Sequence, residues 1–163
     1  ERYFYESFKS MTELFVAVYA RLRETLMTKT LEVLKQADPT PLGLLDPAIR
    51  VFLVFIQEDP RYGRIMLIDA LGSDAEVASL SNQTARDYAG LLKLHLARLV
   101  PDSARDQIDL DLLSDGLIGM NVLLADRWMH DGFATPLDKV VSTNMLPYQG
   151  LVSLLNDVAT PRR

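Results

Sequence analysis

Helix start and stop signals divide almost the whole chain into segments with helical periodicity. Ser10 and Glu13 form a capping box, in which the hydroxyl accepts from the backbone N–H of the third helical residue and the carboxylate reaches back. The apolar residues that follow recur at spacings of three and four, at Leu14, Phe15, Val18, Leu22 and Leu26. No segment shows the strict alternation that is typical of a half-buried strand. The chain is therefore predicted to be all-α.

Similar signals predict the later helix boundaries. Caps occur at Asp46-Pro47, Asp59-Pro60, Ser73 with Glu76, and Thr135 with Asp138. Gly72 and Gly132 are stop signals, and Pro147 is expected to kink or break the last helix. The predicted helices cover residues 1–8, 11–36, 47–58, 60–71, 74–100, 103–131 and 136–156.

Composition restricts the compartment and the partners. The chain has no cysteine, and its longest apolar run, Val51 to Ile56, is far shorter than the ~20 residues of a membrane span. We therefore expect a cytoplasmic protein without a membrane partner. Residues 36–163 carry eleven Lys/Arg and seventeen Asp/Glu, whereas residues 1–35 carry six and five. Because phosphate binding needs positive charge, any DNA contact is expected near the amino end.

The segment from Tyr3 to Tyr19 carries the most informative pattern. Its aromatic, small, acidic and aliphatic residues follow the order Phe4, Tyr5, Phe8, Ser10, Glu13, Leu14, Phe15, Val18 and Tyr19. This pattern resembles the end of the DNA-binding head of the TetR (Tet-repressor) family of transcription regulators. The rest of the chain resembles that family in the order of its helices alone. The alternative is an aromatic packing cluster in an unrelated helical bundle.

The resemblance implies two parts: a remnant of the helix-turn-helix head with its connecting helix, residues 1–36, and a ligand-binding and dimerisation domain, residues 37–163. Residues 1–8 would be a truncated recognition helix, the element that lies in the major groove. The implied DNA contacts are Arg2, Tyr3, Tyr5, Glu6, Ser7 and Lys9. Met11 stands where the family usually has Lys, so Lys9 is the candidate substitute. We expect more of the head upstream of Glu1, and specific operator binding by the full-length protein only.

The implied function is control of transcription, most often repression, by a small, largely apolar effector. The effector would enter the helical core, and the helix at 11–36 would then pivot and change the spacing of the two heads of a homodimer. The candidate ligand-binding residues are Phe52, Phe55, Ile56, Met66, Tyr88, Leu92, His95, Met120, Asn121, Leu124 and Trp128. Each is also a core candidate, because cavity walls and core walls look alike in sequence. Asn121 has three open roles: facing ligand, facing a neighbouring helix or facing the dimer partner.

Two glycines lie within the apolar helix predicted at 103–131. Gly116 and Gly119 each cost roughly 1 kcal/mol of helix stability relative to alanine. Close approach of another helix is the expected compensation, and in the TetR family the last two helices pair with their copies to form the dimer. Crowding within one chain is the alternative.

Enzyme chemistry finds little support in the sequence. The two histidines, His95 and His130, lie in different predicted helices, and no nucleophile elbow, phosphate-binding glycine loop or zinc motif is present. Asp109, Asp111 and Asp115 are expected on a solvated helix face, so we expect neither a metal nor a cofactor. A helical small-molecule carrier without a DNA role is the main alternative function. A small helical enzyme and a purely structural dimer are further alternatives.

Overall fold

The computed structural model describes residues 8–69, 75–101 and 106–159, with the side chains of all of them except residues 68–69 and 156–159. All regular structure in these ranges is helical, which confirms the all-α prediction. The elements are α2 (Met11–Gln36), α3 (Leu45–Glu58), α4 (Pro60–Gly63), the π-helix η1 (Arg64–Asp69), α6 (Ala75–Leu96), α7 (Leu110–His130) and α8 (Leu137–Ala159). The predicted helix at 1–8 and the cap at Ser73 lie outside the described residues.

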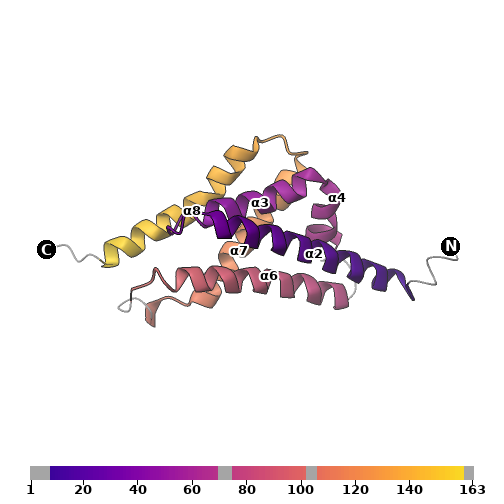
Figure 1. Cartoon of the computed structure of the whole chain (residues 1–163), viewed down its shortest axis with the longest axis horizontal. Coiled ribbons are helices and arrows are strands. Elements are labelled where there is room, and N and C mark those ends of the chain that lie inside the picture. Colours follow the sequence, from indigo (N-terminus) through magenta and orange to yellow (C-terminus); the bar gives the residue numbers. More distant parts are fainter. Residues whose placement is uncertain (1–7, 70–74, 102–105, 160–163) are drawn as a thin grey trace.

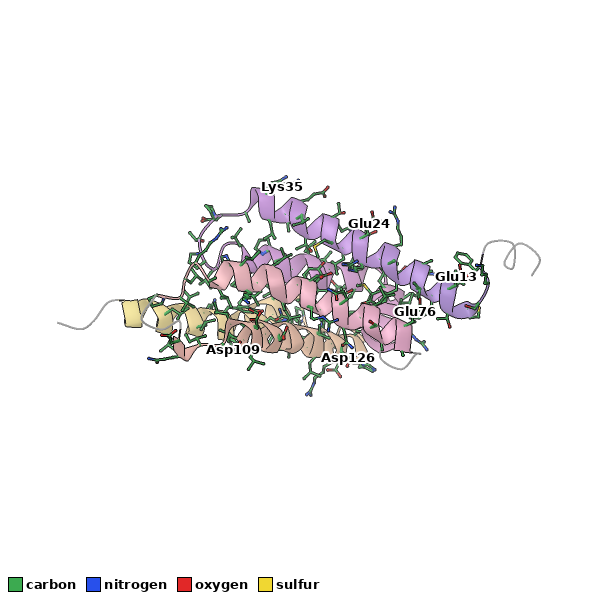
Figure 2. The ribbon with its side chains drawn as sticks, turned by 90° about the horizontal axis from the view of Figure 1, so that it is seen from below. Glu13, Glu24, Lys35, Glu76, Asp109 and Asp126 are labelled. Carbon is green, nitrogen blue, oxygen red and sulfur yellow. The ribbon has the colours of Figure 1, made fainter. Side chains whose placement is uncertain are left out.

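The long helices pack into an elongated bundle. Helices α2 and α6 lie along one side, with α3, α7 and α8 behind them, and the amino end of α2 and the carboxyl end of α8 lie at opposite ends of the molecule (Figure 1). Figure 2 shows Glu13, Glu24 and Lys35 spaced along α2, with Asp109 and Asp126 along α7. The largest fully buried apolar side chains come from four helices, α2, α3, α6 and α8: Tyr19, Leu53, Phe55, Ile56, Val77, Leu96, Val141 and Tyr148.

Helix α2 has the predicted bounds, but its cap differs in one bond. The Ser10 hydroxyl accepts from the Glu13 backbone N–H at 3.1 Å. The Glu13 carboxylate accepts from the backbone N–H of Lys9 at 2.6 Å, one residue before the predicted Ser10. The buried residues of α2 form one stripe at Tyr19, Leu22, Leu26 and Thr30. This stripe fixes which face of α2 the bundle covers.

The segment from α3 to η1 departs from the prediction at two points. Helix α3 begins at Leu45, because the Leu42 carbonyl already accepts from the backbone N–H of Leu45 and of Asp46, so Asp46 lies in the first turn and not at the cap. Asp59 does cap α4, accepting from the Arg61 backbone N–H at 3.0 Å. Instead of one helix over 60–71, four α-helical residues pass into the wider π-helix η1.

The predicted carboxyl end of the helix at 74–100 and the predicted start of the helix at 103–131 are wrong. Helix α6 ends at Leu96, where shorter bonds such as Leu99 N–H to the Leu96 carbonyl tighten the chain into turns. Helix α7 begins at Leu110, because Asp109 caps it by accepting from the backbone N–H groups of Asp111 and Leu112 at 3.0 and 3.1 Å. Gly132, at φ +64°, ends α7 as predicted.

Helix α8 runs through Pro147 without a break. The proline removes the donor to the carbonyl of Thr143, and both residues are exposed, so water can satisfy that carbonyl. Asp138 does not close a capping box: its carboxylate accepts from Arg50 of α3 at 2.6 Å. That bond ties the start of α8 to α3.

Candidate functional site

A cavity of about 810 Å³ lies between α2, α3, η1, α6 and α7, and Tyr148 of α8 contributes to its wall. Pockets for small molecules commonly measure about 300–1,000 Å³. Most of the wall is apolar, including Leu26, Leu34, Leu45, Ile49, Leu67, Ile118 and Val122. The wall reaches the surface between α6 and α7, where Arg86, Leu94, Arg98, Asp115 and Gly119 are exposed. This cavity is the candidate site.

Six of the eleven sequence-predicted ligand residues line this cavity: Phe52, Met66, Tyr88, Leu92, His95 and Asn121. Phe55 and Ile56 lie one turn beyond Phe52, and Phe55 stacks on Tyr62 with ring centroids 5.0 Å apart. Trp128 lies two turns beyond Asn121, donates from Nε1 to the Thr135 carbonyl at 2.7 Å and meets Phe133 edge-on. Met120 and Leu124 are half-buried on α7. These five are not among the lining residues, because helical periodicity gives a face but not where along it a cavity ends.

Helix α2 supplies wall residues that the sequence reasoning missed. Tyr19, Leu26, Thr30 and Leu34 all line the cavity. Thr30 is buried, and its hydroxyl donates to the Leu26 carbonyl at 2.9 Å. Thr84 of α6 does the same toward Leu80. A buried threonine on an otherwise apolar helix stripe was the available signal, since its hydroxyl can be satisfied within its own helix.

Two buried polar groups in the wall lack partners. Asn121 is 8% exposed, and its Nδ2 donates to the Tyr148 hydroxyl at 2.8 Å, but its Oδ1 is buried without a hydrogen bond. The Tyr88 hydroxyl is also buried and forms no hydrogen bond of normal length, although the Thr30 hydroxyl lies near enough to lower its pKa somewhat. Burial raises the pKa of both tyrosines above the ordinary value. Unsatisfied buried polar groups are rare in folded proteins, so each needs an explanation.

His95 joins the cavity to the loop that follows α2. Its Nε2 lies 2.8 Å from the Pro41 carbonyl oxygen, and since a carbonyl can only accept, Nε2 carries the hydrogen. The loop is ordered by its own side chains: Asp38 accepts from the Thr40 backbone N–H, and the Thr40 hydroxyl accepts from the Gly43 backbone N–H, both at 3.1 Å. His95 is therefore hydrogen-bonded as well as lining the cavity.

An ion pair ties α2 to α6 beside the cavity. Arg23 donates to Asp87, the residue before Tyr88. Asp87 also accepts from the Gln83 amide at 2.8 Å. The Gln83 bond and then the Arg23 bond lower the pKa of Asp87 below its ordinary value. Helix α2 is thus fixed to α6, the helix that carries Tyr88.

The implied DNA-contacting residues Arg2, Tyr3, Tyr5, Glu6 and Ser7 lie outside the described residues. Lys9 is exposed just before α2, where its backbone donates to Glu13. Lys9 therefore lies at the amino end of α2.

Helices α7 and α8 each expose a stripe of apolar and small residues. On α7 it consists of Leu112, Gly116, Gly119 and Leu123, and on α8 of Leu146, Pro147, Gly150 and Leu154. A Cβ added at Gly116 or Gly119 would meet nothing within 4 Å. Crowding within one chain, the alternative explanation for these glycines, is therefore wrong.

The three aspartates near the start of α7 do not share one role. Asp109 is the helix cap, and Asp111 accepts from Lys93 of α6 at 2.7 Å, whereas Asp115 is exposed at the cavity rim. All three are exposed, as predicted, but Asp109 precedes the helix as its cap. In the described ranges, no three His, Asp or Glu side chains gather as a metal site would require.

None of the described helices is both long and apolar enough to span a membrane. The sequence matches no protein-family model and no curated protein.

Proposed function

We propose that this chain is the regulatory part of a TetR-type transcription regulator, a repressor, whose small, largely apolar effector binds in the cavity. One observation carries the proposal: α2, which follows the implied recognition helix at residues 1–8, also forms a wall of the cavity. Ser10 caps α2 directly after that segment, and Tyr19, Leu26, Thr30 and Leu34 of the same helix line the cavity. A ligand that moves this wall moves the residues before Ser10.

The link between α2 and α6 supports the mechanism. A ligand in the cavity touches both helices, and Arg23–Asp87 holds them together next to Tyr88. If effector binding favours a second arrangement of α6, α2 pivots with it. The two DNA-binding heads then leave the spacing of about 34–36 Å that matches successive major grooves. A coupling of about 1–3 kcal/mol changes DNA affinity five- to 150-fold.

The exposed stripes of α7 and α8 are the proposed dimer interface. A self-complementary pair of apolar helix faces is what a twofold dimer requires. A Cβ added at Gly116, Gly119 or Gly150 would meet nothing within 4 Å, so another backbone can approach closely at these three positions. The α7 stripe meets the rim of the cavity at Gly119. Dimerisation would thus bring the two cavities next to the shared interface.

The DNA role is tested with the full-length protein and the DNA that flanks its own gene. Binding is compared with an unrelated duplex at about 50 and about 200 mM salt, where phosphate contacts lose most of their affinity. The proposal predicts sequence-preferring, salt-sensitive binding by a dimer. Equal binding to both duplexes would favour the helical carrier, which shares the cavity but needs no operator.

A further inference from the structure

The polar atoms of the cavity define the chemistry of its ligand more narrowly than its apolar wall does. Asn121 is more than nine-tenths buried, and its Nδ2 is already used by Tyr148, so the orphaned atom is the oxygen Oδ1. An amide oxygen can only accept. The group missing at this position is therefore a hydrogen-bond donor.

His95 adds a second acceptor to the wall. Because its Nε2–H donates to the Pro41 carbonyl, the neutral ring has its lone pair on Nδ1. The buried Tyr88 hydroxyl forms no hydrogen bond of normal length, but it lies near the Thr30 hydroxyl, whose own hydrogen is used by the Leu26 carbonyl. Tyr88 can therefore donate toward Thr30 and still accept. The hydrogen-bonding capacity that Asn121, His95 and Tyr88 have left is thus mainly for accepting hydrogen bonds.

Charge is confined to the rim. Arg86, Arg98 and Asp115, the charged residues of the wall, are exposed, and no Lys, Arg, Asp or Glu among the described residues lines its buried part. An ionised group in the interior would lose its hydration without gaining a counter-ion, which costs more than any neutral hydrogen bond returns. The buried part of the ligand must be uncharged.

We propose that the cavity binds an uncharged molecule whose apolar body carries a hydroxyl or an N–H donor, and that Asn121 accepts from this donor. Oδ1 is buried and has no hydrogen-bond partner among the described residues, while Nδ2 is held by Tyr148. A ligand hydroxyl or N–H at this point of the wall would supply the bond that Oδ1 lacks. The inference rests on the proposed function in taking the cavity as the effector site.

Four probes of one shape test the inference: naphthalene, 2-methoxynaphthalene, 2-naphthol and 2-naphthoate. They offer no polar group, an acceptor, a donor and a negative charge, respectively. Equilibrium dialysis against the chain, up to the solubility of each probe, gives the affinities. We expect 2-naphthol to bind about three- to tenfold more tightly than 2-methoxynaphthalene, the effect of one neutral hydrogen bond, and 2-naphthoate to bind most weakly.

Two matched variants locate the donor site. Asn121→Leu should abolish the preference for 2-naphthol while naphthalene still binds. Asn144→Leu makes the same substitution at another fully buried asparagine, which does not line the cavity, and should keep the preference. Should Asn121→Leu fail to fold, Asn121→Ala gives the same readout. Equal affinities for 2-naphthol and 2-methoxynaphthalene, or a preference that survives in the Asn121 variant, would overturn the inference.

The outcome separates the inference from the proposed function. If the chain prefers 2-naphthol but the full-length protein binds no DNA selectively, the proposed ligand chemistry stands and the proposed role as a transcription regulator is wrong. Selective DNA binding without the preference removes the ligand chemistry alone. Failure of all four probes to bind removes the ligand site itself.

Discussion

Asn121 of α7 donates to the hydroxyl of Tyr148 of α8 across 2.8 Å, and both residues line the cavity. This bond joins the wall of the candidate ligand site to one of the two helices that expose an apolar stripe. It also leaves Asn121 Oδ1 as an unpaired buried acceptor.

Removing the Tyr148 hydroxyl tests how much its hydrogen bond with Asn121 contributes to the stability of the fold. Tyr148→Phe leaves both polar atoms of the Asn121 amide buried without a partner, so we expect a loss of about 1–3 kcal/mol in the free energy of unfolding. Urea denaturation measures it. The double variant Tyr148→Phe/Asn121→Leu should recover part of the loss, because no orphaned amide remains. If Tyr148→Phe leaves the free energy of unfolding unchanged, the Asn121–Tyr148 hydrogen bond is not formed in solution.

Stability should fall in alkaline solution because of two tyrosines. Burial raises the pKa of Tyr88 and of Tyr148 in the folded chain, so the unfolded chain releases these protons first. Their stabilisation is complete below the ordinary tyrosine pKa of about 10 and is lost as pH rises through the folded-state pKa values. Urea unfolding between about pH 8 and 11 should therefore show a shallower decline in Tyr88→Phe/Tyr148→Phe than in the wild type. Parallel declines would contradict the assignment.

Two glycines should respond to alanine with opposite signs. A Cβ at Gly43 would lie 2.5 Å from the Asp38 carbonyl oxygen and 2.6 Å from the Thr40 hydroxyl, so Gly43→Ala should cost about 1–3 kcal/mol. Gly90 lies in α6 and a Cβ there meets nothing within 4 Å, so Gly90→Ala should gain up to about 1 kcal/mol from helix propensity. Thermal unfolding compares the two, and a stabilised Gly43→Ala would refute the loop geometry.

The proposed dimer is tested at Leu123, the last residue of the α7 stripe. Leu123 is 68% exposed, so Leu123→Glu should leave the fold of one chain intact while placing two charges in the interface of a dimer. Sedimentation equilibrium should show a dimer for the wild type and a shift toward monomer for Leu123→Glu. Leu31→Glu, at an exposed leucine of α2, is the control and should remain dimeric. A dimer unaffected by Leu123→Glu would place the interface elsewhere.

Local signals predicted α2 and the start of α4 well, because Ser10 and Asp59 each form a cap with their neighbours in sequence. The start of α7 was missed, because Asp109 was taken as part of a helix face when its side chain is in fact the cap. Asp138 resembled half of a capping box, yet Arg50 lies 88 positions away in sequence and binds it in the fold. Such long-range competition leaves no trace in a local pattern.

The sequence predicted which helix faces point inward, but not which residues along those faces border the cavity. Phe52 and Phe55 belong to one apolar stripe of α3, and only packing decides that Phe52 borders the cavity while Phe55 stacks on Tyr62. The contribution of α2 was missed because its stripe was interpreted as a connection to the head. The partnerless state of Asn121 Oδ1 depends on where Tyr148 lies, and no spacing within α7 gives that.

The central claim is that occupancy of the cavity controls DNA binding. Ala48→Trp fills part of the cavity from α3, and Ala75→Trp, at an exposed position outside it, is the matched control. The affinity of each full-length variant for the DNA flanking its gene is measured against the wild type. The account predicts at least a fivefold change, within about five- to 150-fold, for Ala48→Trp and none for Ala75→Trp. Unchanged DNA affinity in an Ala48→Trp protein that folds and no longer binds 2-naphthol would contradict it.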